Sequence, residues 1–187
     1  MIAEFTVLTV PGWNGSGPTH WQSIWGAGST GFRRVNQRDW QRPSRREWID
    51  SIDREVGNAD PPVILVAHSL GCIAVAHWAA SRIVAAVAGA LLVAPPWLTA
   101  SETCPVELRS FLPMPLGRLP FRSILVASEN DPYLPIELAV RLARSWGSEF
   151  VNAGRQGHIN VASGHGAWPT GERLLEGLCQ VCAGARA

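Results

Sequence analysis

Short apolar runs rich in β-branched residues alternate along this chain with longer segments of helical periodicity. The expected strands are 5–10, 32–36, 62–67, 86–94, 123–127 and 149–152. The expected helices are 19–25, 44–56, 70–81, 135–146 and 172–182. Ser44 and Glu47 have the spacing of a capping box at the start of the second helix. The alternation predicts a single α/β domain over residues 1–187, a mostly parallel sheet with helices on both faces.

Composition excludes several classes of protein. At 187 residues, with 47% hydrophobic and 17% charged residues, the chain suits one buried core and is too apolar to be disordered. A formal net charge of +1 argues against a nucleic-acid partner, because phosphate binding needs a positive surplus. No signal peptide is evident, and the apolar run 83–96 is shorter than the roughly 20 residues that span a bilayer. We therefore expect a cytoplasmic protein with no membrane partner, and leave its oligomeric state open.

The cysteines and two of the histidines do not form a metal motif. Cys179 and Cys182 are closely spaced, but no second cysteine pair or suitably spaced histidine pair completes a zinc site. The pair lies in an apolar helical pattern, where cysteine behaves as a small buried hydrophobe. His20 and His77 are interpreted as surface or packing residues of helices. We expect neither a metal nor a cofactor.

The strongest local signal is the segment 66–71, Val-Ala-His-Ser-Leu-Gly, where an expected strand runs into an expected helix. Small residues at Ala67 and Gly71 let strand and helix approach closely, which exposes Ser69 at the tip of a tight turn. The backbone N–H of Leu70 can then donate to a developing oxyanion. His68 is interpreted as structural, with its ring directed away from the serine. The competing interpretation is that Ser69 is only a buried or capping serine.

A serine nucleophile needs a base and an acid that orients it, and both follow in the sequence. Asp131 comes directly after the expected strand 123–127, and Glu129 is its rival. His158 follows the last strand on a glycine-bounded loop, and His165 is its rival. We predict that Asp131 and His158 serve Ser69. The order Ser, Asp, His is that of α/β-hydrolases.

Two further segments complete the predicted site. The glycine-rich loop 11–17 follows the first strand, and the backbone N–H of Trp13 is predicted as the second oxyanion donor. This loop lacks the endings and spacings of a phosphate-binding loop. The proline-rich segment 95–120 shows no clear period and should lie over the carboxyl ends of the strands, where such sheets bind ligands. Trp97 and Leu98 are predicted to line the substrate pocket, and Phe111 is a further candidate.

Several motifs together resemble the small serine-hydrolase family that includes retinoblastoma-binding protein 9 and many bacterial α/β-hydrolases. They are Gly12-Trp13, His20-Trp21-Gln22, His68-Ser69-Leu70-Gly71, Asp131-Pro132, Gly157-His158-Ile159-Asn160 and Trp168-Pro169-x-Gly171. The resemblance spans nearly the whole chain. It implies a compact α/β-hydrolase fold without a large cap domain, and a triad of Ser69, Asp131 and His158. Ala67 departs from the usual first glycine of the serine motif.

These observations predict a serine hydrolase that cleaves small carboxylic esters through an acyl-enzyme. Its partner would be a small-molecule ester. Two alternatives remain open at this point. A thioesterase or acyltransferase would use the same residues, and a binding protein could keep a hydrolase scaffold with little turnover.

Overall fold

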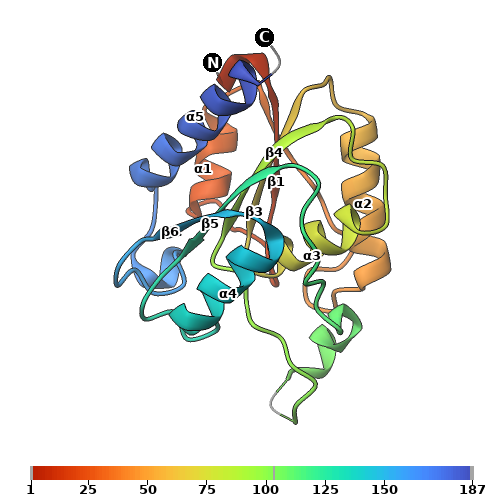
Figure 1. Ribbon diagram of the computed structural model, residues 1–187, viewed down its shortest axis with the longest axis vertical. Coiled ribbons are helices and arrows are strands. Elements are labelled where there is room, and N and C mark those ends of the chain that lie inside the picture. The colour runs from red at the N-terminus through yellow and green to blue at the C-terminus, as the bar shows by residue number, and fades with distance from the viewer. Residues whose placement is uncertain (1, 103, 186–187) are drawn as a thin grey trace.

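A computed structural model describes residues 2–102 and 104–185, and its framework is a six-stranded sheet (Figure 1). The strands are β1 (Thr6–Val10), β2 (Phe32–Arg34), β3 (Val63–His68), β4 (Val87–Val93), β5 (Arg122–Ala127) and β6 (Glu149–Asn152). Their order in the sheet is β2-β1-β3-β4-β5-β6, and every neighbouring pair is parallel. The carboxyl ends of all six strands therefore meet at one edge.

Helices cover both faces of this sheet. They are α1 (Trp21–Ala27), α2 (Arg45–Gly57), α3 (Leu70–Ala79), α4 (Ile136–Trp146) and α5 (Pro169–Gly184), with short 3-10 helices η1 (Ile2–Glu4), η2 (Val106–Phe111) and η3 (Val161–Ser163). In Figure 1, α1 and α5 lie on one side of the sheet, and α2 and α3 lie on the other. The expected parallel sheet with helices on both faces is confirmed. None of the described helices is long and apolar enough to cross a membrane.

The sheet divides the apolar interior into two cores, and its central strand β3 contributes to both, because successive side chains of a strand point to opposite faces. Val63, Leu65 and Ala67 belong to the core beneath α2, α3 and α4. Ile64 and Val66 belong to the core beneath α1 and α5. All five are fully buried. Such an uninterrupted apolar strand is typical of a sheet covered on both sides.

Three local expectations need correction. Ser44 is the N-cap of α2, but no capping box forms: its side chain makes no capping bond, and the Glu47 carboxylate accepts a hydrogen bond from Arg38 at 3.3 Å. The last helix begins at Pro169, earlier than expected, because proline needs no N–H partner in the first turn of a helix. Within 95–120, where no period was evident, η2 forms and projects below the sheet in Figure 1.

Candidate active site

Ser69 occupies the turn between β3 and α3 in a conformation that few non-glycine residues adopt. Its φ is 52° and its ψ is −127°. Its N–H donates to the carbonyl of Val93 at 2.9 Å. Gly71 lets the turn pack closely against the end of β1, since a Cβ at Gly71 would overlap the carbonyl oxygen of Val10. Strain held in this way is a feature of functional sites, and here it exposes a hydroxyl at the carboxyl edge of the sheet.

A continuous hydrogen-bond chain joins Ser69 to His158 and Asp131. Ser69 Oγ lies 2.9 Å from His158 Nε2, and His158 Nδ1 lies 2.9 and 3.0 Å from the two carboxylate oxygens of Asp131. A carboxylate can only accept, so Nδ1 carries the hydrogen and Nε2 is left to accept from the serine hydroxyl. The N–H of Tyr133 donates to Asp131 Oδ1 at 2.9 Å, and the Asp131 side chain is only 1% exposed. This arrangement can remove a proton from Ser69.

The two rival residues lie elsewhere. Glu129 is exposed and accepts a hydrogen bond from the Asn152 side chain at 3.0 Å. His165 Nε2 lies 3.1 Å from the carbonyl oxygen of Gln156. The fold therefore brings Asp131 and His158 to the serine and leaves Glu129 and His165 outside this hydrogen-bond chain.

The loop after β1 lies directly against the serine turn. A Cβ at Gly12 would stand 2.7 Å from Ser69 Cβ and 3.3 Å from the backbone nitrogen of Leu70, so only glycine permits this approach. Trp13 follows Gly12, and Leu70 is the first residue of α3. The first N–H groups of a helix have no acceptor within it, so the Leu70 N–H is free to bind an oxyanion. Trp13 and Leu70 both line the hollow beside Ser69.

That hollow has a volume of about 570 Å³. Trp97 and Leu98 line it together with Ser69 and His158. Its other lining residues are Asn14, Gly15, His20, His68, Pro96, Thr99, Ser101, Cys104, Pro105, Leu108, Pro132, Tyr133 and Asn160. Phe111 does not line it, because that ring is fully buried and packs at 5.7 Å against the ring of Trp48. The beginning of the segment 95–120 thus borders the hollow, while Phe111 belongs to the core.

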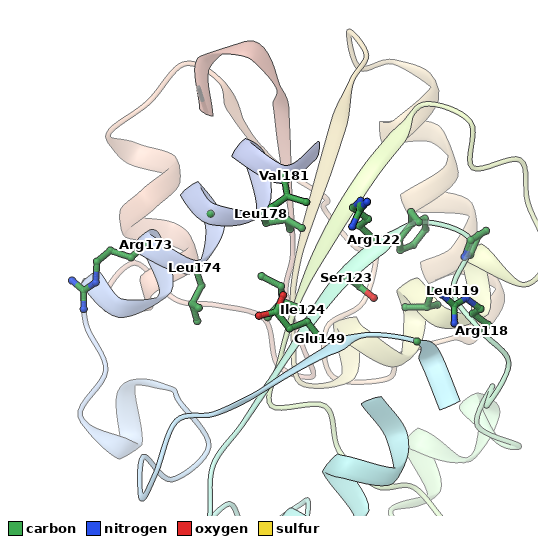
Figure 2. A pocket seen from close by; sticks show the side chains of 14 residues that line it. Arg118, Leu119, Arg122, Ser123, Ile124, Glu149, Arg173, Leu174, Leu178 and Val181 are labelled. Carbon is green, nitrogen blue, oxygen red and sulfur yellow. The ribbon is translucent and has the colours of Figure 1, made fainter. Parts of the chain in front are cut away.

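A larger hollow, of about 830 Å³, lies between α5 and the amino ends of β5 and β6 (Figure 2). Arg118, Arg122 and Arg173 line it, and Figure 2 shows Arg173 at one end and Arg118 at the other, so their charges do not converge. Parallel sheets bind ligands at the carboxyl ends of their strands, which is the opposite edge. The candidate active site is therefore the smaller hollow beside Ser69.

His20 belongs to this site, although the sequence suggested only a surface or packing role. His20 is only 5% exposed. Its Nδ1 accepts a hydrogen bond from the N–H of Gln22 at 3.2 Å and so caps the start of α1. Burial, and to a lesser degree the charge of Arg34, lowers the pKa of His20 to about 4, so the ring is neutral at pH 7. Among the described residues, its Nε2 has no hydrogen-bond partner. Two signals were available: its membership of the motif His20-Trp21-Gln22, and its place directly before α1.

Tyr133 is a second site residue that the sequence did not single out. Its ring meets that of His158 edge-on, with centroids 4.7 Å apart, and 58% of the residue is exposed. An aromatic ring at the mouth of a hollow can contact bound apolar groups while it remains partly in water. Its position two residues after Asp131 was the only sequence signal.

All four cysteines are reduced and buried. Burial raises the pKa of Cys179 to about 11, so its thiol stays protonated at neutral pH. Across residues 2–102 and 104–185, no three His, Cys, Asp or Glu side chains gather as a metal site would require. Cys179 and Cys182 pack in the core beneath α5, as small hydrophobes do.

Comparison with known proteins gives one family. The sequence matches the serine hydrolase family over residues 7–177. The fold is similar to that of a YdeN-like hydrolase from Pectobacterium atrosepticum, with 30% identity, 97% of this chain and 94% of that chain covered, and a TM-score of 0.86. It also resembles the ydeN gene product of B. subtilis, with 19% identity, coverage of 94% and 99%, and a TM-score of 0.75. No match was found among curated proteins.

Proposed function

The chain belongs to the serine hydrolase family, and we propose that it cleaves small carboxylic esters with Ser69 as nucleophile, His158 as base and Asp131 as the orienting acid. The observation that carries this proposal is the hydrogen-bond chain from Asp131 through His158 to the strained Ser69. Ser69 and His158 both line the hollow. Nucleophile, base and orienting group within hydrogen-bond reach form the arrangement that activates a serine.

The mechanism is acyl transfer to water. His158 Nε2 takes the proton of Ser69 as Oγ attacks the ester carbonyl, and Asp131 stabilises the imidazolium that forms. The N–H groups of Leu70 and Trp13 bind the carbonyl oxygen as it becomes an oxyanion. The intermediate expels the alcohol, which receives the proton from His158. Water then attacks the acyl-enzyme with the same base and releases the carboxylic acid.

The dimensions of the hollow favour a small, partly apolar substrate. A volume of about 570 Å³ is within the range of small-ligand sites, about 300–1,000 Å³. Trp97 and Leu98 offer apolar surface for an acyl or alkyl group. We place the whole reaction within one catalytic domain, residues 1–187, with the segment 95–120 bordering the mouth of the hollow.

A fluorophosphonate probe and a panel of p-nitrophenyl esters of increasing acyl length test the proposal. Mass spectrometry of the labelled protein should find the probe on Ser69. Ser69→Ala should remove labelling and lower kcat on the order of 10³-fold or more, because it deletes the attacking oxygen. Ser110→Ala is the matched control, since Ser110 is exposed and lies outside the hollow. A folded Ser69→Ala protein that keeps more than a tenth of the activity, on any ester, contradicts the assignment.

The alternatives predict other outcomes of the same experiment. A thioesterase or acyltransferase should be labelled at Ser69 but turn over thioesters, or transfer the acyl group to an added alcohol, faster than it hydrolyses esters. A binding protein on this scaffold should remain unlabelled.

A further inference from the structure

His158 lies on the loop between β6 and α5, residues 153–168, named here the base loop. Three ring N–H groups outside this loop donate to its carbonyl oxygens. His68 Nε2 binds the carbonyl of His158 itself at 3.0 Å. Trp21 Nε1 binds the carbonyl of Ile159 at 2.9 Å, and Trp25 Nε1 binds that of Ala167 at 2.7 Å. The backbone at the base is thus bound to β3 and to α1.

The side of the sheet on which the His68 ring lies follows from the alternation of side chains along β3. As the last residue of that strand, it shares the face of Ile64 and Val66, on the side of α1 and α5. Its ring packs between those of His20 and His158, with centroid distances of 4.8 and 5.0 Å. Because Ser69 follows directly, one short segment carries both the nucleophile and the donor that reaches the base.

The chemistry of the His68 ring defines its role as a donor. A carbonyl oxygen can only accept, so Nε2 must carry the hydrogen. Burial, helped by the neighbouring histidines, holds the pKa of His68 well below its usual range. The ring is therefore neutral, with one N–H, and that N–H is directed to the carbonyl of His158.

The base loop needs such contacts because its backbone departs from the common conformations beside His158. Gly157 has a φ of 57°, which glycine adopts readily, but Ile159 has a φ of 47°, which is rare for a β-branched residue. Conformations of this kind persist only where surrounding contacts hold them. Asn130 Oδ1 accepts the N–H of Gly157 at 2.8 Å, on the side of the loop before the base.

We propose that His68 is a positioning residue: its N–H holds the backbone of His158 so that the imidazole meets Ser69 Oγ. Trp21 supports the same stretch of backbone from α1. The proposal rests on the function proposed above, in which His158 is the base. A displacement of about 1 Å at a reacting group can cost about 10²-fold in rate, so loss of the His68 donor should slow acylation strongly.

Substitutions at His68 separate the donor from the bulk of the ring. His68→Gln keeps an N–H at a similar reach, and His68→Met keeps apolar bulk without a donor. The measurement is labelling by the fluorophosphonate probe, which yields a rate constant and a final labelled fraction. We expect His68→Met to label to completion about 10²-fold more slowly than wild type, and His68→Gln to remain close to wild type. A purely structural role would instead lower the final fraction and leave the rate constant unchanged.

Trp21 and Trp25 provide a matched pair. Trp21→Phe and Trp25→Phe each remove one indole N–H from the same helix and the same core. Ile159 adjoins the base, whereas Ala167 lies near the far end of the base loop. Trp21→Phe should therefore slow labelling, and Trp25→Phe should lower thermal stability to a similar degree without slowing it.

Each outcome decides the proposal. A wild-type rate constant for fully labelled His68→Met overturns it, as does equal slowing by Trp21→Phe and Trp25→Phe. If His68→Met does not fold, His68→Asn replaces it, because its amide is one methylene too short to reach the carbonyl; equal rates for the Asn and Gln variants then overturn the proposal. Wild-type protein that is not labelled at Ser69 contradicts the proposed function instead, so the two failures are distinguishable.

Discussion

Replacing Asp131 by asparagine should reverse the position of the proton on His158. The N–H of Tyr133 donates to Asp131 Oδ1 at 2.9 Å, so the amide oxygen of asparagine must take that position. The amide NH₂ then replaces Oδ2, which lies 2.9 Å from His158 Nδ1. An Nδ1–H could then donate only to the amide oxygen, which lies 3.0 Å away and already accepts the Tyr133 N–H. An Nδ1 that accepts from the NH₂ satisfies all three groups, so the neutral ring carries its hydrogen on Nε2. That hydrogen faces Ser69 Oγ, so the base can no longer accept the serine proton.

The expected loss is large although the change replaces only one atom. The wrong tautomer of a triad histidine lowers kcat by about 10⁴-fold. At about 1.36 kcal/mol per factor of ten, this corresponds to about 5 kcal/mol of transition-state stabilisation. The fold should be little affected, because asparagine has the volume of aspartate and keeps the hydrogen bond to Tyr133.

The assay is kcat/KM on a short p-nitrophenyl ester, with thermal unfolding followed by circular dichroism. Glu129→Gln is the matched control, since it makes the same chemical change at the rival carboxylate, which binds Asn152 and not His158. Activity of Asp131→Asn within tenfold of wild type would refute the tautomer argument. A severe loss from Glu129→Gln alone would move the acid to that residue.

The remaining predictions concern the base, the hollow and pH. His158→Ala should match the loss of the serine nucleophile, whereas His165→Ala should cost little in kcat; the reverse result, in folded protein, would move the base to position 165. Trp97→Ala should shift the preferred ester towards longer acyl chains, since each methylene in an apolar pocket is worth about 1–3 kcal/mol. Phe111→Ala should lower the free energy of unfolding by about 3–5 kcal/mol without that shift, and an unchanged preference in Trp97→Ala would contradict the pocket assignment. The pKa of His20 is about 4 in the folded chain against 6.5 ordinarily, so the unfolded chain binds the proton first as the pH falls. Because the pKa values of His68 and His77 are lowered as well, His20 is tested by difference. In urea denaturation, His20→Gln should lose about 2 kcal/mol less stability than wild type between pH 7 and pH 5, and an equal loss in the two proteins would disprove the contribution of this ring.

Local patterns were sufficient for much of the fold. Strand and helix periodicity depends on neighbours in the chain, so the six strands, the parallel sheet and the covering helices could be predicted from the residues alone. The serine turn was visible for the same reason, because a buried strand, Ser69, Gly71 and a helix follow one another directly. The ends of helices were harder to predict from the sequence. The apolar pattern predicted that the last helix begins at residue 172, whereas α5 begins at Pro169.

The contacts that shape the site are not local, and only the tertiary structure determined them. From the sequence, Asp131 was predicted over Glu129 as the acid and His158 over His165 as the base, but the hydrogen bonds that distinguish these residues join separate loops. Phe111 was a further pocket candidate beside Trp97 and Leu98, and only the fold placed it in the core.

The backbone contacts of the base loop left the least trace in the sequence. His68 and the carbonyl of His158 are 90 residues apart, and Trp21 and the carbonyl of Ile159 are 138 apart. A hydrogen bond to a carbonyl requires no particular side chain at the accepting position, because every residue carries that group. The acceptor therefore has no signature in the amino-acid sequence, and the pairing arises only when β3, α1 and the base loop pack together.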